Sequence, residues 1–134
     1  MSVTADTAGS YVVSAAVGDL SLSNSLPLTV TQVDAAESVV TPTELNGSGN
    51  ITITLKDSSG TDLGHGGHVV TVDSSSDAFI FTAGGFGSFS DIVDNNDGTY
   101  SVSVTCLKST NGNSFNIEVQ ADSTLVGSVD VTCP

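Results

Sequence analysis

Positively charged side chains are almost absent from this chain. Its 134 residues include two lysines and no arginine, against fifteen Asp and Glu, and the formal net charge is −13. Proteins that bind nucleic acids or anionic membranes need Lys and Arg to displace counterions. The composition therefore excludes nucleic acids and anionic membrane surfaces as partners.

Long apolar runs are missing as well. No stretch approaches the roughly 20 apolar residues that a membrane-spanning helix needs, so we expect no membrane insertion. Apolar residues do not recur at helical spacing over any useful length. Hydrophobic residues nevertheless make up 38% of the chain, which is enough for a thin core between two sheets. The solvated positions are mainly Ser, Thr, Asn and Gly, as in many secreted and surface-layer proteins.

The pattern that is present has a period of two. Apolar and polar residues alternate in 51–56, 100–106, 115–121 and 129–133. Clusters of Gly, Asn, Asp and Ser separate these stretches and are typical of turns. This alternation predicts an all-β protein whose antiparallel strands have one face covered and one face in solvent.

Seven short strands are expected in the last hundred or so residues. They are predicted at 37–43, 50–57, 68–74, 78–82, 99–106, 114–122 and 127–133. About seven alternating strands in roughly 100 residues are typical of an immunoglobulin-like antiparallel β-sandwich. We letter them A to G.

The first 32 residues repeat part of the sequence that follows. Residues 9–17 have the pattern of 113–121, and residues 1–4 and 26–31 match 102–105 and 127–132. We therefore expect residues 1–32 to be the end of strand E and strands F and G of a preceding repeat, and residues 33–134 to be a complete repeat. A strand hairpin is marginal alone, so it is expected to complete a sheet, either in a longer tandem array or in another chain.

The stretch Asp94-Asn95-Asn96-Asp97-Gly98-Thr99-Tyr100 resembles the turn that leads into a strand in filamin-type repeats. Gly112-Asn113-Ser114-Phe115 and Gly127-Ser128-Val129 resemble the approaches to the last two strands of that family. Bacterial invasin/intimin-type immunoglobulin-like repeats share the Asp-Gly-Thr-Tyr strand. The resemblance spans roughly residues 33–134 and implies an immunoglobulin-like (filamin-type) sandwich from a tandem-repeat protein.

Two departures separate the chain from cytoskeletal filamins. Cys106 and Val129 stand where filamins have proline, and Lys and Arg are nearly absent. These differences argue against an actin-linked role in the cytoplasm.

The two cysteines, Cys106 and Cys133, end the expected strands E and G. In an up-and-down count these strands run the same way, so both cysteines reach one pole of the sandwich and can form a disulfide. A single disulfide is typical of an oxidising compartment. Glycosylation sequons at Asn46 and Asn50 favour the same conclusion. We expect an extracellular or cell-surface location.

Metal sites are candidates at two places. Asp91, Asp94 and Asp97 could share a calcium ion, but counting from Asp94 puts Gly98 at position five of the loop, where an EF-hand needs an oxygen ligand. A tight turn in which Gly98 has positive φ explains the acidic residues better. His65 and His68 are too few for zinc, and a solvated loop is expected there. No metal or cofactor is expected.

No catalytic arrangement is apparent: no serine lies in a nucleophile elbow, and paired carboxylates occur only in turns. We therefore expect no enzyme but a structural repeat, acting as a rod, spacer or filament subunit whose partners are neighbouring repeats or copies of itself. The alternative is a module that binds a protein or glycan, through an edge strand or through the loops 60–68 and 82–90. If Phe86 and Phe89 are exposed, they would contact a ligand of the loop 82–90; if they turn inward, they cap the core.

Overall fold

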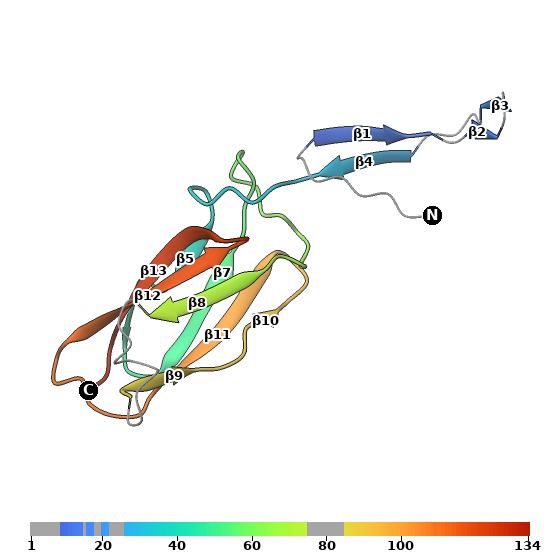
Figure 1. Cartoon of the computed structure of the whole chain (residues 1–134). Helices are drawn as coiled ribbons and strands as arrows, with labels where there is room; N and C mark the ends of the chain where they lie inside the picture. The colour runs from blue at the N-terminus through green and yellow to red at the C-terminus, as the bar shows by residue number, and fades with distance from the viewer. Residues whose placement is uncertain (1–8, 15, 18–19, 22–25, 75–84) are drawn as a thin grey trace. The chain divides into compact units, whose positions relative to one another are not determined.

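The computed structural model describes residues 9–14, 16–17, 20–21, 26–74 and 85–134 (Figure 1). Backbone contacts divide the chain into two units, Met1–Gln32 and Val33–Pro134. That residues 1–32 come from a preceding repeat stays a prediction. The strand expected at 78–82 and the match at 1–4 lie outside the described residues. No helix in the described ranges has the length and hydropathy to cross a membrane.

The first unit consists of two small antiparallel ribbons. Its strands are β1 (Gly9–Val13), β2 (Ala16–Val17), β3 (Leu20–Ser21) and β4 (Leu26–Val30); β1 pairs with β4, and β2 with β3. Tyr11 lies opposite Leu28 in the longer ribbon. Tyr11, Val12 and Leu26 are exposed. Among the strand residues of this unit whose exposure is described, 9–13, 26 and 27, none is buried.

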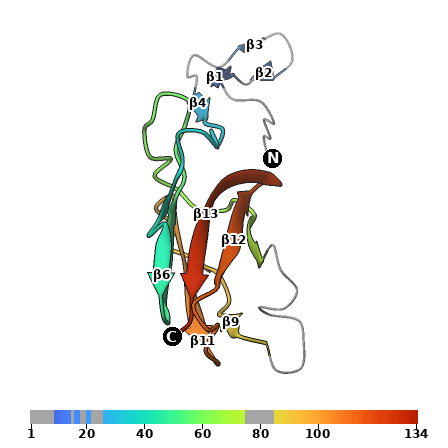
Figure 2. The same ribbon diagram turned by 90° about the vertical axis from the view of Figure 1, so that its left-hand side faces the viewer.

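The second unit is a sandwich of two sheets. One sheet contains β5 (Val39–Thr41), β7 (Gly49–Thr54), β9 (Gly87–Phe89), β10 (Val93–Asp94) and β11 (Thr99–Cys106). The other contains β6 (Glu44–Asn46), β8 (Val70–Ser74), β12 (Ser114–Ala121) and β13 (Thr124–Thr132). Figures 1 and 2 show the two layers from two sides. The predicted all-β, immunoglobulin-like sandwich is confirmed.

The core lies between the two sheets and follows the alternation in the sequence. In β11 every second residue from Tyr100 to Val104 is buried, whereas Ser103 and Thr105 point to solvent. Fully buried side chains from both sheets include Ile51, Ile53, Val102, Ile117, Val119, Val129 and Val131. Each buried side chain of this size contributes about 1.5–3 kcal/mol by leaving water. Branched and aromatic side chains suit these positions because they pack well on a pleated surface.

The first expected strand, 37–43, corresponds to β5 alone, and a short strand that was not expected, β6, follows it in the other sheet. β5 pairs with β7, the chain turns at Pro42, and β6 then pairs in parallel with β13, with Asn46 opposite Thr132. In Figure 2, β6, β13 and β12 lie side by side. Proline cannot donate a backbone hydrogen bond, so it interrupts the ladder at the crossing.

Two further segments differ from expectation. Part of the region expected to be a loop forms β9, which pairs with the end of β11, and β10 pairs with its start. β13 begins at Thr124, earlier than expected, because Asp122 and Ser123 adopt positive φ angles of 49° and 68° and close a two-residue hairpin turn.

The segment Val33–Ser38, which precedes β5, is folded onto the second unit. The Asp34 N–H donates to the Lys56 carbonyl at 2.7 Å, and the Lys56 N–H donates to Ser38 Oγ at 3.0 Å. Ser38 Oγ in turn donates to the Asp34 carbonyl at 2.7 Å. Val33 and Ala35 pack against the core. This segment therefore belongs to the sandwich rather than forming a free linker.

Candidate functional site: the two poles of the sandwich

The loops of the second unit gather at two poles. The segment Val33–Ser38, the loop 55–69 and the turns 94–98 and 122–123 form what we call the linker pole. The turn 47–48, the loop 107–113 and the ends of β11 and β13 form the disulfide pole. The loops 60–68 and 82–90, which the binding hypothesis used together, are thus at opposite poles for their described residues. The described residues of these loops, 60–68 and 85–90, therefore do not form a single site.

The acidic turn at the linker pole is held by its own backbone. Asp94 accepts hydrogen bonds from the amides of Asn96 at 2.8 Å and Gly67 at 2.7 Å. Asp97 accepts from both the amide and the hydroxyl of Thr99. Asn96 has φ 61° and Gly98 has φ 84°, as the turn interpretation requires. Since Asp94 and Asp97 are each bound to amides of the turn, turn geometry accounts for these acids.

These hydrogen bonds also affect ionisation. The pKa of the Asp94 carboxyl lies below its usual value because the Asn96 amide, and then the Gly67 amide, stabilise the anion. The pKa of Asp97 is lowered for the same kind of reason, chiefly by the Thr99 hydroxyl. Both carboxylates are therefore ionised well into the acidic range.

His68 is not a solvated loop residue, contrary to expectation. Its Nδ1 lies 2.8 Å from Asp122 Oδ2, and its side chain is only 16% exposed. The His68 N–H donates to the Tyr100 hydroxyl at 3.0 Å, and the Val69 N–H donates to Asp122 Oδ1 at 3.0 Å. Burial raises the pKa of the Tyr100 hydroxyl. No sequence pattern indicates this contact, which joins the loop before β8 to the turn between β12 and β13.

No metal centre is assembled in the described part of the chain. Within residues 26–74 and 85–134, no three His, Cys, Asp or Glu side chains come together as metal ligands would. His65 and His68 stack with ring centroids 5.4 Å apart, whereas Asp91 lies in the exposed segment between β9 and β10. The calcium candidates Asp91, Asp94 and Asp97 stay predictions that this geometry does not favour.

A disulfide joins Cys106 and Cys133 at the other pole, with the Cα atoms 5.6 Å apart. Cys106 ends β11 in one sheet, and Cys133 directly follows β13 in the other. The bond therefore connects the two layers of the sandwich, a consequence that strand direction alone did not reveal. Cys133 is fully buried.

Hydrogen bonds fix both ends of the disulfide. Thr110 is buried; its N–H and hydroxyl donate to the Cys133 carbonyl at 2.8 and 3.1 Å, and its Oγ1 accepts from the Cys133 N–H. The N–H of Cys106 donates to Ser48 Oγ at 2.8 Å. The N–H groups of Leu107 and Lys108 both donate to the Phe86 carbonyl. The loop after β11 and the segment after β13 are thus joined by more than the sulfur atoms.

Phe86 and Phe89 are half-buried and pack against the core. The Phe86 ring lies 5.3 Å from that of Phe115, centroid to centroid, and Phe89 lies opposite the buried Val104. Of the two alternatives for these rings, exposure in a binding loop or packing on the core, the structure shows packing on the core. A ligand that used these rings would have to draw them out of the core.

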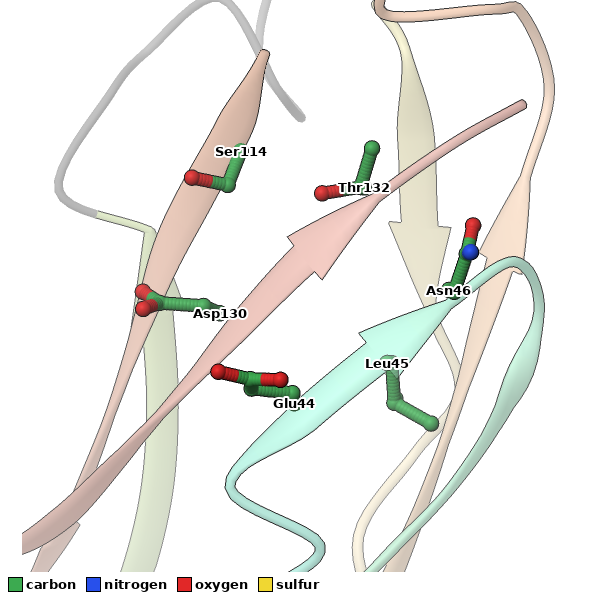
Figure 3. Close-up of a pocket in the computed structure, with 6 residues that line it drawn as sticks. All are labelled: Glu44, Leu45, Asn46, Ser114, Asp130 and Thr132. Carbon is green, nitrogen blue, oxygen red and sulfur yellow. The ribbon is translucent and has the colours of Figure 1, made fainter. Parts of the chain in front are cut away.

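The two sequons differ in their surroundings. Asn46 is exposed at the end of β6 and borders a shallow hollow of about 310 Å³ on the outer face of the β6–β13 pair (Figure 3). Asn50 is exposed within β7, where its Oδ1 accepts from the Ser103 hydroxyl at 2.8 Å. The other residues that line the hollow are Glu44, Leu45, Ser114, Asp130 and Thr132. Glycosylation at either asparagine stays a prediction.

The oxygens around the hollow belong mainly to side chains of two neighbouring strands. Asp130 lies opposite Glu44 on the parallel strand pair, and its Oδ1 accepts a hydrogen bond from the side-chain Nδ2 of Asn116 at 2.8 Å. Figure 3 shows the carboxylates of Glu44 and Asp130 lying along the strand surface rather than converging on one point. The hollow therefore offers polar surface but no enclosed binding site.

Comparisons with known proteins identify solved structures of similar architecture. No protein-family model matches the sequence, and none of the curated proteins compared with it matches either. Among solved structures, invasin, a bacterial integrin-binding protein, matches with TM-score 0.61 and 27% identity over 95% of this chain. The Escherichia coli adhesin FdeC matches with TM-score 0.60 and 16% identity over 94% of this chain.

The surface-layer protein SbsC, domains 4–9, matches with TM-score 0.53 and 18% identity over 95% of this chain. The chain spans only a part of each of these proteins: 25% of the invasin chain, 40% of FdeC and 18% of SbsC. The predicted resemblance to bacterial immunoglobulin-like repeats is confirmed: the fold of this chain is similar to that of invasin and of the other surface proteins compared.

Proposed function

We propose that the chain is a structural repeat of an extracellular protein built from tandem immunoglobulin-like domains, in which it acts as a rod or spacer at a cell surface. The observation that carries the proposal is the folded segment Val33–Ser38. Strand β4 ends at Val30 and the second unit begins at Val33, so only Thr31 and Gln32 lie between β4 and the sandwich. Short connections of this kind limit the freedom of neighbouring domains.

Two further observations support the proposal. The match to invasin covers 95% of the chain, which includes both units, as expected if residues 1–32 belong to a preceding repeat. The Cys106–Cys133 disulfide suits an oxidising compartment outside the cytoplasm. The exposed Tyr11, Val12 and Leu26 then lie in two strands, β1 and β4, of a sheet whose remaining strands come from the rest of that repeat.

The location is tested by treating intact cells with a protease that cannot enter them. We expect peptides of this chain to be released and the Cys106–Cys133 pair to be recovered as one disulfide-linked peptide when no reductant is used. Recovery of the peptides only after lysis, with both thiols free, would contradict an extracellular role. A cytoplasmic protein followed in the same sample controls for lysis.

An adhesive role is the second candidate, because invasin is described as integrin-binding and FdeC as an adhesin. In this chain the edge strands β5, β6 and β10 have two or three residues and β8 has five, and the aromatic rings of the loop 85–90 pack on the core. Direct binding of the labelled chain to host cells and to a glycan array separates the roles. Saturable binding would favour adhesion, and its absence would favour the spacer.

A further inference from the structure

We propose that the Cys106–Cys133 disulfide makes both sheets of the sandwich carry tension together, and that it removes residues 107–132 from the path of the force. The inference deepens the proposed rod function and rests on it for its biological purpose. The mechanical claim itself concerns only residues 33–134 and holds for the domain wherever it resides.

Force that enters through the linker pole reaches both sheets. β5 and β6 follow one another in the chain, and both run from the linker pole toward the disulfide pole. β5 pairs with β7 in one sheet, and β6 pairs with β13 in the other. A pull on Val33 therefore acts on each sheet through one short strand.

Force that leaves through the C-terminal end would, without the disulfide, reach only one sheet. The backbone continues from Cys133 into β13, and β13 resists through its parallel pairing with β6. That pairing consists of three residue pairs, from Asp130 opposite Glu44 to Thr132 opposite Asn46. The hydrogen bonds run across the strands, so pulling along the strands loads these bonds together in shear.

The disulfide opens a second route into the other sheet. Cys106 is the last residue of β11, so tension at Cys133 also pulls β11 toward the disulfide pole. β11 pairs with β7, and β7 pairs with β5 through three residue pairs, from Val39 opposite Thr54 to Thr41 opposite Thr52. The bonds of β5 and the bonds of β6 must then shear at the same time.

The residues around the disulfide hold both cysteines in place, so force passes from Cys133 to Cys106 before either segment has to move. Thr110 binds both backbone groups of Cys133 at 2.8–3.1 Å, and the Cys106 N–H is held by Ser48. Cys133 is fully buried, so its side chain cannot swing before the load is passed on. A disulfide on a mobile loop would tighten only after that loop had extended.

The test is single-molecule pulling of the full chain through handles at residues 32 and 134, with the oxidised protein compared with Cys106→Ser/Cys133→Ser. The cysteines are 27 positions apart in sequence and their Cα atoms are 5.6 Å apart, so the disulfide prevents about 90 Å of chain from extending. We expect the gain in chain length on unfolding to be longer by that amount in the serine variant. We also expect its unfolding force to be about twofold lower, because one sheared strand pairing replaces two.

A second pulling geometry separates load sharing from overall stability. With the handle moved from residue 134 to residue 111 in the loop 107–113, force enters β11 and β12 directly in both proteins. With handles at residues 32 and 111, we expect the oxidised protein and the serine variant to unfold at similar forces. Equal forces with handles at 32 and 134, or a twofold drop with the handle at 111 as well, would overturn the proposal. If the serine variant does not fold, Cys106→Ala/Cys133→Val provides the same comparison.

Discussion

His68 and Asp122, which are 54 positions apart in sequence, meet at 2.8 Å at the linker pole. The contact joins the loop before β8 to the hairpin turn of β12 and β13. The same carboxylate accepts the Val69 N–H, so one acidic side chain fixes two residues of the loop. Burial opposes ionisation of Asp122, but its hydrogen bonds from His68 and Val69 outweigh burial and lower its pKa.

Asp122→Asn should destabilise the domain more at neutral pH than at low pH. A lowered folded-state pKa gives stability that is present above the unfolded value of about 3.9 and is lost as the pH falls through the folded pKa. Asn tolerates the positive φ of residue 122, so the turn is kept. We expect a loss of about 1 kcal/mol at pH 7, measured by urea unfolding, and a smaller loss at about pH 3, below the unfolded value.

Asp91→Asn is the matched control, since Asp91 is exposed in the segment between β9 and β10. It should leave the unfolding free energy unchanged at both pH values. If the two variants respond alike, general charge rather than the His68 contact governs the pH dependence.

Gly98→Ala should be more damaging than Gly112→Ala, although the two glycines have nearly the same φ, 84° and 82°. A Cβ at Gly98 would lie 2.9 Å from the Gly64 backbone nitrogen, whereas one at Gly112 meets nothing within 4 Å. The shared cost of positive φ is about 1 kcal/mol. We expect Gly98→Ala to cost about 2–3 kcal/mol in thermal or urea unfolding. Equal losses would contradict the close packing of this turn on the loop 55–69.

Ile117→Ala should cost about 2–5 kcal/mol, because Ile117 is fully buried between the sheets and its truncation leaves a cavity. Val93→Ala provides the comparison, since Val93 is 55% exposed and should cost less than about 0.5 kcal/mol. Urea unfolding of both variants measures the difference. A similar loss in the two variants would mean that the two sheets do not pack as described.

Removal of the disulfide in Cys106→Ser/Cys133→Ser should lower the unfolding free energy by about 3–4 kcal/mol, mainly because the unfolded chain becomes less constrained. The single variant Cys106→Ser should lose no more than the double variant, because Cys133 then remains as a buried thiol, which packs like a small apolar group, whereas Cys133→Ser places a hydroxyl in the core. Urea unfolding without reductant measures both. A loss below about 1 kcal/mol in the double variant would mean that the bond adds strain equal to its benefit.

The alternation in the sequence predicted the strands in which it runs long. β11 and β12 have eight residues each, and their inward positions, such as Val102 and Ile117, follow the expected faces. β6, β9 and β10 have two or three residues, too few for alternation to be detected. Their pairing depends on which strands happen to lie beside them.

The candidate site was predictable only where it depends on local chemistry. The turn around Gly98 follows from the preferences of Asn, Asp and Gly, and the meeting of Cys106 with Cys133 follows from strand direction. The contact between His68 and Asp122 depends on two distant turns sharing one pole, and nothing near either residue indicates it. Likewise, only the sheet order reveals that the disulfide connects the two layers.

Ser38→Ala should loosen the segment that leads into β5. Ser38 is buried, and its hydroxyl both donates to the Asp34 carbonyl and accepts from the Lys56 N–H. The variant leaves the Lys56 N–H without this partner, so we expect a loss of about 1–2 kcal/mol in urea unfolding. Ser59→Ala, on the exposed turn that follows Lys56, should cost less. Equal small losses would mean that the segment 33–38 is not held by Ser38.

The central claim, that the segment Val33–Ser38 at the start of the second unit is part of the rigid domain, is tested most directly by ¹⁵N relaxation of the full chain. We predict backbone order parameters of about 0.85 for residues 33–38, equal to those of β7 and β11. Values below about 0.6 across this segment would show a flexible tether and would contradict the account of this chain as a rod or spacer.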